Sequence, residues 1–230
     1  MISALHRCIF VHIERTGGTS IELALTGFDW WESAARAEKH LTAEQCRRRY
    51  GIDTWRRYTT FAFVRDPWDL VVSSYAFFCS RKRSTLRGMS FREYVLSAGD
   101  AAQRVDGDGW THGGWWHDRG VCQLDWIVDR DGALLVDYVG RFETLQADFD
   151  AICAATGRPS PPLPHEGRSE RRPYTDYYDP QTRGLVERLF RRDIERFGYA
   201  FGTPPPPRAR PFEPRDFLPP PACGIRAGGA

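Results

Sequence analysis

The segment covering residues 12–20, His-Ile-Glu-Arg-Thr-Gly-Gly-Thr-Ser, has the composition of an anion-binding loop. Its two glycines would let the backbone approach an anion closely, its Thr-Ser pair adds hydroxyl donors, and Arg15 adds positive charge. A plain strand-to-helix turn capped by a threonine is the alternative interpretation. The Walker A pattern is absent and neither lysine of the chain is nearby in sequence, which disfavours a conventional ATPase or GTPase.

A second segment, residues 61–75, has the sequence Phe-Ala-Phe-Val-Arg-Asp-Pro-Trp-Asp-Leu-Val-Val-Ser-Ser-Tyr. Arg65 follows a buried run, and Asp66 with the proline after it forms a helix-start signal. Ser73 lies nearly two helical turns beyond that start, so an anion beside the helix would contact both Arg65 and Ser73. Alternatively, Arg65 pairs with Asp66 or Asp69, and Ser73 is a plain surface serine.

The elements that position these segments follow from apolar spacing. Short buried runs alternate with stretches of helical periodicity, although residues 80–120 show little periodicity. The predicted strands are 8–13, 60–64 and 133–137. The predicted helices are 18–26, 42–50, a stretch from 67 onward, 143–156 and about 181–197. This alternation predicts a three-layer α/β domain around a mostly parallel sheet, with the ligand at the carboxyl ends of the strands.

Length and charge limit the remaining possibilities. The 230 residues suit one domain, predicted as 1–202, and nine of the 16 prolines lie in an extended or disordered tail, 203–230. The 32 basic and 30 acidic residues give a net charge of +2, which argues against a broad nucleic-acid-binding face.

The sequence has no membrane-spanning run and no signal-peptide layout, which predicts a cytoplasmic protein. The six cysteines lack a CxxC pair and are predicted to be reduced and buried.

Taken together, the two segments resemble sulfotransferases that use 3′-phosphoadenosine 5′-phosphosulfate (PAPS). The resemblance is to the carbohydrate group that contains the heparan-sulfate 2-O-sulfotransferases and many bacterial relatives. Residues 14–20, ERTGGTS, are similar to that family's PKTGGTS loop, and Arg65 with Ser73 match its RxPxxxxxS motif. The resemblance extends over about 1–201. Glu14 replaces the family's proline, and Arg15 replaces its lysine, which keeps the charge but not the geometry of a point cation.

The resemblance implies a P-loop-like sulfotransferase fold and a nucleotide site in two parts. The 3′-phosphate would be held by Arg65 and Ser73, and Arg15 would also stabilise the departing phosphate. No metal is required. The 5′-phosphosulfate would be held by Arg15, Thr16, Gly17, Gly18, Thr19 and Ser20.

A base must take the proton of the acceptor hydroxyl, and His40 is the candidate. It precedes a predicted helix cap at Thr42, and a neutral imidazole suits this task. In the 2-O-sulfotransferase relatives a histidine also lies between the two phosphate loops. Glu22, predicted as a solvated helix residue, and His117 are the alternatives. A purely structural histidine is the other interpretation of His40.

Two further stretches are candidates for ligand contacts. Trp110, Trp115 and Trp116 would suit stacking on sugar rings, with core packing or a subunit contact as the alternative. Residues Ser169–Arg172 lie where a loop of the relatives closes over the nucleotide, with a solvated basic stretch as the alternative.

The resulting prediction is an enzyme, a soluble PAPS-dependent sulfotransferase that transfers the sulfuryl group to a hydroxyl of a carbohydrate or glycoconjugate, with a small molecule as the other acceptor class, and releases 3′-phosphoadenosine 5′-phosphate (PAP). Neither a metal nor a nucleic-acid partner is expected, and a homo-oligomer is left open. The alternatives are a kinase-like phosphotransferase acting on a small molecule and an inactive PAP-binding protein.

Overall fold

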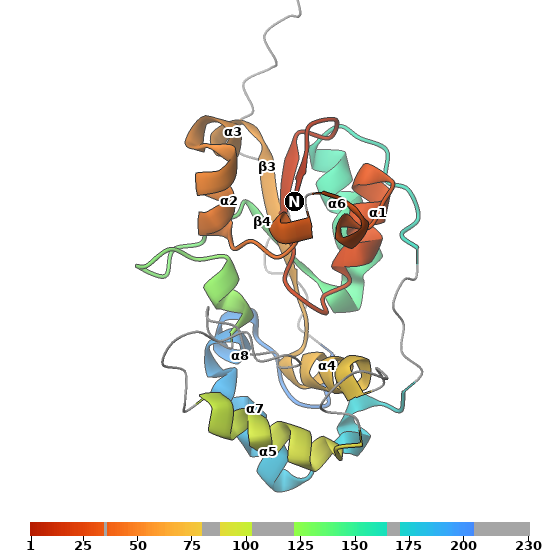
Figure 1. The fold of residues 1–230 in the computed structure, drawn as a ribbon, viewed down its shortest axis with the longest axis vertical. Coiled ribbons are helices and arrows are strands. Elements are labelled where there is room, and N and C mark those ends of the chain that lie inside the picture. Colours follow the sequence, from red (N-terminus) through yellow and green to blue (C-terminus); the bar gives the residue numbers. More distant parts are fainter. Residues whose placement is uncertain (35, 80–87, 103–121, 165–170, 205–230) are drawn as a thin grey trace, which may run out of the picture.

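The computed structural model describes residues 1–34, 36–79, 88–102, 122–164 and 171–204 (Figure 1). A four-stranded sheet forms its centre, with the strands in the order β1-β2-β3-β4. The first pair is antiparallel, and the other two pairs are parallel. The strands are β1 (Ile2–Ser3), β2 (Cys8–Val11), β3 (Thr59–Val64) and β4 (Tyr138–Arg141). The predicted mostly parallel α/β sheet is therefore confirmed.

Helices cover both faces of the sheet and complete three layers (Figure 1). Alternate residues of each strand face opposite sides, so Phe61 and Phe63 pack in one cluster while Ala62 and Val64 pack in another. The first cluster includes α1 (Gly18–Thr26) and α6 (Leu145–Ala155), and the second includes α2 (Ala43–Tyr50) and α3 (Ile52–Arg57).

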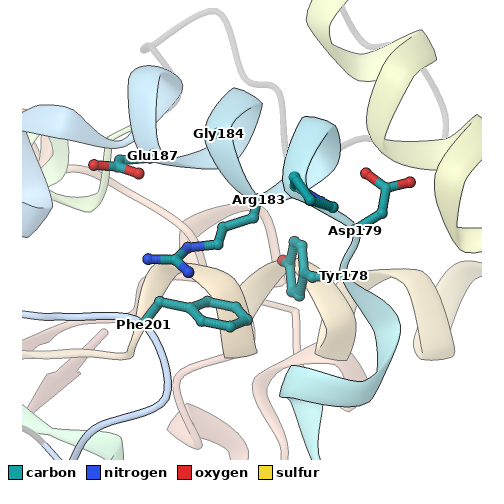
Figure 2. Close-up of a pocket in the computed structure, with 7 residues that line it drawn as sticks. Tyr178, Asp179, Arg183, Gly184, Glu187 and Phe201 are labelled. Carbon is teal, nitrogen blue, oxygen red and sulfur yellow. The ribbon is translucent and has the colours of Figure 1, made fainter.

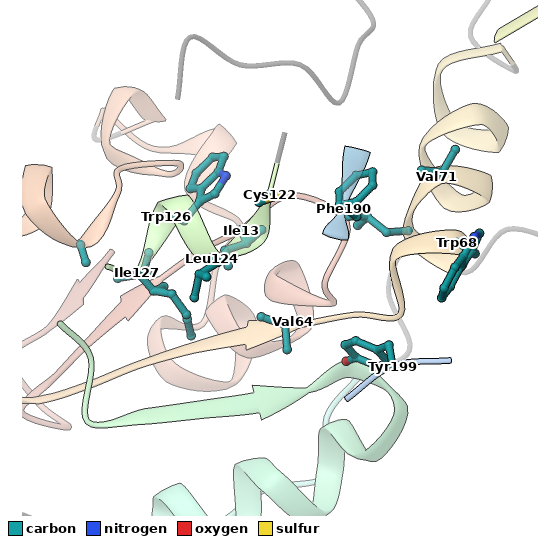
Figure 3. Packing of buried hydrophobic residues seen from close by; sticks show 14 of the residues in the cluster. Ile13, Val64, Trp68, Val71, Cys122, Leu124, Trp126, Ile127, Phe190 and Tyr199 are labelled. Atoms are coloured by element: carbon teal, nitrogen blue, oxygen red, sulfur yellow. The ribbon is translucent and has the colours of Figure 1, made fainter. Parts of the chain in front are cut away.

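A second group of helices lies beyond the carboxyl ends of the strands (Figure 1). It consists of α4 (Pro67–Cys79), α5 (Phe91–Ala102), α7 (Pro180–Leu189) and α8 (Arg191–Phe197). Short 3₁₀ turns complete the described chain: Trp30–Glu32, Arg36–Glu38, Gln123–Trp126, Phe142–Thr144 and Tyr174–Tyr177. Figure 3 shows the larger core cluster extending from Leu124 and Val64 to Phe190 and Val71, which ties this group of helices to the sheet.

Local signals explain where the helices begin. Thr42 forms the predicted capping box at α2, since its hydroxyl accepts from the Gln45 N–H and the Gln45 side chain accepts from the Thr42 N–H. The Asp66 carboxylate accepts the Trp68 N–H at 2.9 Å and so caps α4, as predicted. The start of α4 immediately after β3 fixes Arg65 at the end of the sheet.

The third predicted strand is displaced in the structure. Residues 133–136 do not pair with β3, and the strand is Tyr138–Arg141 instead, preceded by one bond from the Asp137 N–H to the Thr60 carbonyl at 2.9 Å. A turn at 129–132 folds the residues that follow it back on residues 127–128, where the Leu135 N–H donates to the Ile127 carbonyl at 2.8 Å. The prediction of a strand at 133–137 was wrong because the local turn captures these apolar residues.

The last predicted helix is two helices, α7 and α8, separated at Phe190. The Phe190 ring is fully buried, and the bend also brings the Asp193 carboxylate to the N–H groups of Gln123 and Leu124, at 2.8 and 2.9 Å. Tertiary packing thus overrides a continuous helical pattern. The helices α3 and α5 were not predicted.

Two composition-based expectations bear on the described residues. Cys8, Cys46, Cys122 and Cys153 are buried, as predicted, and no disulfide joins these four residues. Among the helices in the described ranges, none is both long and apolar enough to cross a bilayer.

Candidate functional site

The two predicted phosphate-binding segments meet at the carboxyl edge of the sheet. Strands β2 and β3 are parallel neighbours, so the loop after Val11 and the residue after Val64 begin side by side. The Arg65 Nη1 donates to the carbonyl oxygen of Arg15 at 2.8 Å. The Arg15 Nε and Nη2 both donate to the Ser73 hydroxyl at 3.2 Å. Arg15, Arg65 and Ser73 therefore form one cluster.

The loop between β2 and α1 has a left-handed turn at two positions. Arg15 has a φ of 62° and Gly17, the residue before α1, has a φ of 83°. The Thr16 hydroxyl closes the loop by donating to the Ile13 carbonyl at 2.8 Å. Thr16 and Ser20 are buried, whereas Thr19 is partly exposed. The loop is thus fixed by its own internal bonds, with the start of α1 directly behind it.

Both glycines of the loop are also required by packing. A Cβ on Gly18 would lie 2.1 Å from the His12 ring, and one on Gly17 would lie 2.8 Å from a methyl group of Leu145. The sequence predicts that these glycines let an anion approach the backbone closely. The structure adds that the protein's own side chains fill the space a Cβ would need.

Arg65 is buried, with only 5% of its side chain exposed. Its guanidinium lies over the Phe142 ring, 3.8 Å from the centroid. Its Nε and Nη2 both donate to the Asp69 Oδ2, at 2.7 and 2.6 Å. The alternative of an ion pair with Asp69 is therefore present in the structure, while Asp66 serves as the helix cap.

The backbone of Arg65 is held by a side chain from another segment. The Gln123 side chain accepts from the Arg65 N–H and donates to the Arg65 carbonyl, both at 2.8 Å. Gln123 therefore bonds Arg65 as a neighbouring strand would, one residue past the end of β3. Sequence reasoning did not identify Gln123, since no local pattern marks it.

Arg171 brings a third guanidinium to this cluster. Its Nη1 lies 2.6 Å from the Asp69 Oδ1, so one carboxylate bridges Arg65 and Arg171. Burial opposes ionisation of Asp69, but the two arginines outweigh it and hold its pKa below the usual value. Of the predicted closing segment Ser169–Arg172, only Arg171 and Arg172 belong to the described residues.

His40 lies against the first residue of the loop between β2 and α1, His12. Its Nδ1 is 3.0 Å from the His12 carbonyl oxygen, which only accepts, so Nδ1 carries the proton and Nε2 keeps its lone pair. The Nε2 is 4.0 Å from a carboxylate oxygen of Glu14. Burial, with a smaller contribution from His12, lowers the pKa of His40 to about 3. The imidazole is therefore neutral near pH 7, so Nε2 is able to accept a proton, but a pKa this far below the working pH gives it a weak driving force for doing so.

A buried charged network lies directly behind His40. Glu22 accepts from His12 Nδ1 at 2.7 Å and from Lys39 Nζ at 2.6 Å, and Lys39 also bonds Asp29. The prediction that Glu22 is a solvated helix residue was wrong, since its side chain is fully buried. Its spacing from Leu25, three residues along α1, already placed it on the buried face, and that signal was missed.

A separate pocket of about 360 Å³ lies beside the start of α7 (Figure 2). In it, the Arg183 guanidinium stacks on the Phe201 ring, 4.6 Å from the centroid. None of the predicted site residues lines this pocket. It is lined by residues that include Tyr178, Asp179, Arg183, Gly184, Glu187 and Phe201.

His117 and the stretch Trp110–Trp116 lie outside the described residues. Over the ranges that the structure describes, no group of three or more His, Cys, Asp or Glu side chains is placed to hold a metal ion.

Comparison with known proteins identifies the family that the chain resembles. The model of the group described as "Sulfotransferase family" matches residues 1–200. A curated relative from Archaeoglobus fulgidus, described as an uncharacterized protein, is 26% identical over 121 residues, which is 52% of this chain and 84% of the relative. No solved structure matches at a significant level.

Proposed function

Since the chain belongs to the sulfotransferase family, we propose that it transfers the sulfuryl group of PAPS to a hydroxyl of a carbohydrate or glycoconjugate and releases PAP. The observation that supports this most directly is the contact between the two phosphate-binding segments. Arg15 bonds the Ser73 hydroxyl, and Arg65 bonds the Arg15 carbonyl. A nucleotide with phosphates at two positions needs such a pair of adjoining cationic sites.

The binding roles divide between the loop and the start of α4. The backbone N–H groups of residues 16–20, at the positive end of α1, and Arg15 would bind the 5′-phosphosulfate. Arg65 and Ser73 would bind the 3′-phosphate, with Arg171 as an additional cation. Guanidinium groups suit this task because they bind phosphate oxygens in a planar fork.

In the reaction, the acceptor oxygen attacks the sulfur while the bond from sulfur to the phosphate oxygen breaks. The hydroxyl proton passes to His40 Nε2, the nitrogen that the bond from Nδ1 to His12 leaves unprotonated. The charge that develops on the departing phosphate would be stabilised by Arg15 and the loop N–H groups. The Glu14 carboxylate, 4.0 Å from Nε2, favours the imidazolium that results.

A kinase-like activity is less well supported. A phosphotransferase of the P-loop type uses a lysine to contact the transferred phosphate. Lys39 is the one lysine among the described residues, and its ammonium group is buried against Glu22 and Asp29. Lys39 is therefore not placed to contact a transferred phosphate.

Calorimetry with PAP, ATP and GTP is the first test, and transfer of labelled sulfate from PAPS to a panel of glycans is the second. We expect PAP to bind well and ATP and GTP to bind poorly. Arg65→Ala should weaken PAP severely and adenosine 5′-phosphosulfate, which lacks the 3′-phosphate, much less. Preference for ATP over PAP would overturn the proposal, and PAP binding without any transfer would indicate a nucleotide-binding protein that lacks catalysis.

A further inference from the structure

Three groups surround the guanidinium of Arg65. The Phe142 ring covers one face at 3.8 Å, and the Arg15 carbonyl accepts from Nη1 at 2.8 Å. The Asp69 Oδ2 accepts from both Nε and Nη2. The edge formed by Nε and Nη2 presents two parallel N–H groups, the arrangement that binds phosphate or carboxylate most strongly. A carboxylate of the protein itself therefore occupies the anion-binding edge.

The second oxygen of the same carboxylate also forms an ion pair with an arginine. The Asp69 Oδ1 lies 2.6 Å from the Arg171 Nη1, so Asp69 spans two arginines from segments far apart in sequence. The side chains of Asp69 and Arg171 are each 16% exposed, whereas that of Arg65 is 5% exposed. The bridging carboxylate thus lies at the outer edge of the cluster, where rotation about its side-chain bonds would carry it into solvent.

We propose that Asp69 competes with the 3′-phosphate of the nucleotide: its carboxylate binds Arg65 and Arg171 in the nucleotide-free protein and leaves them when the phosphate binds. This inference rests on the proposed function, because it takes the 3′-phosphate to be the ligand of Arg65. The competition lowers the affinity for PAP and thereby promotes release of the product. Asp69 is therefore a residue that sets affinity for this phosphate without touching the reacting atoms.

The charges explain why the exchange is feasible. A phosphate monoester carries nearly two negative charges and replaces a carboxylate that carries one, beside three guanidinium groups. The interaction energy that the phosphate gains from the arginines therefore exceeds the energy that Asp69 loses. The net affinity for PAP is still reduced by the cost of breaking the two ion pairs of Asp69. Ion pairs between surface side chains are each worth up to about a factor of five in an equilibrium constant, and we take that value for each of the two pairs of Asp69. Removal of the competing charge should thus tighten PAP binding by about tenfold.

The experiment compares PAP with AMP, which has the same nucleoside and 5′-phosphate but lacks the 3′-phosphate. Calorimetry gives both dissociation constants for the wild type, Asp69→Asn, and the control Asp53→Asn, which removes the same charge from the exposed surface of α3. We expect Asp69→Asn to bind PAP about tenfold more tightly and AMP with unchanged affinity. The control should leave both constants unchanged.

Three results would overturn the inference alone: weaker PAP binding by Asp69→Asn, which would make Asp69 a support for Arg65; unchanged PAP binding; or an equal gain for AMP, which would indicate a general charge effect. A wild-type protein that does not bind PAP would instead overturn the proposed function, and this inference with it. The three results for Asp69→Asn leave the proposed function intact.

A second variant keeps the inference testable if Asp69→Asn loses its cooperative unfolding transition. Arg171→Gln removes one of the two partners of Asp69 and a proposed partner of the phosphate. We expect it to weaken PAP more than AMP. Where Asp69→Asn folds, its gain for PAP should be smaller in the Arg171→Gln background, and an undiminished gain would contradict competition at Arg171.

Discussion

At the scale of single residues, His40 combines a fixed tautomer with a low proton affinity. The bond from Nδ1 to the His12 carbonyl leaves Nε2 as the accepting atom, and burial lowers the pKa to about 3. The neutral form therefore persists down to acidic pH. The loss of rate that protonation of this histidine causes should appear only as the pH falls towards about 3.

We expect His40→Ala to lower turnover by about 10²–10⁴-fold, because the proton acceptor for the hydroxyl is lost. PAP affinity should hardly change, since the proposed nucleotide contacts lie in the two phosphate segments. His6→Ala, which removes a histidine from the turn between β1 and β2, is the matched control. Normal turnover with poor PAP binding in His40→Ala would show that His40 shapes the nucleotide site instead.

Gly18 gives a second prediction at this scale. A Cβ there would lie 2.1 Å from the His12 ring, which Glu22 holds in place, so Gly18→Ala should lower the free energy of unfolding by about 1–3 kcal/mol. Gly184→Ala is the control, because its new Cβ finds nothing closer than Arg188 at 3.7 Å. That helix-interior change should stabilise the protein by up to about 1 kcal/mol. Chemical denaturation of both variants measures the contrast, which an equal effect would contradict.

At the scale of secondary structure, the element that holds His40 depends on Lys39. The Lys39 ammonium is buried between Glu22 and Asp29, so it anchors the segment before α2 to the inner face of α1. Lys39→Met should cost about 3–5 kcal/mol of unfolding free energy, because Glu22 would keep a buried charge without its cation. Urea denaturation measures the loss.

Two further variants separate this effect from a general loss of charge. Arg36→Met removes an exposed cation from the same segment and should change stability by less than about 0.5 kcal/mol. Lys39→Met combined with Glu22→Gln should regain part of the loss, since no uncompensated carboxylate remains. Equal stability of Lys39→Met and Arg36→Met would show that the network contributes little.

The elements that sequence reasoning found are those with local signals. Thr42 and Asp66 cap their helices as their sequence context predicts. The strand at 138–141 and the break at Phe190 depend on contacts with distant segments, which no local pattern encodes. The same holds for the site: the two phosphate segments were visible in the sequence, but the bridge from Arg65 through Asp69 to Arg171 spans more than one hundred residues of chain.

At the scale of the whole molecule, buried titrating groups act in opposite directions. Histidine in an unfolded chain titrates near about pH 6.5. Because the folded pKa of His40 is about 3, the unfolded state binds more protons between these values, and stability is lost as the pH falls through them. Burial raises the pKa of Asp193 to about 6, so the folded state binds more protons there, and this group adds stability as the pH falls from about 6 towards 4.

Stability differences between each variant and the wild type should therefore change with opposite signs. As the pH falls from 6.5 to 4, His40→Asn should gain stability relative to the wild type. Over the same range Asp193→Asn should lose stability relative to the wild type. Urea denaturation at several pH values measures both differences, and differences that do not vary with pH would contradict the shifted pKa values of these two buried groups.

The two hydrogen bonds between the Gln123 side chain and the backbone of Arg65 have a kinetic consequence. Because both backbone groups of Arg65 are held at 2.8 Å, we expect a change of anion at this arginine to need rotation of side chains but no movement of its main chain. No slow rearrangement of the main chain would precede the encounter with nucleotide. Association should then proceed at the ordinary rate for diffusional binding, and differences in affinity among variants at Asp69 and Arg171 would reside in how long the nucleotide stays bound.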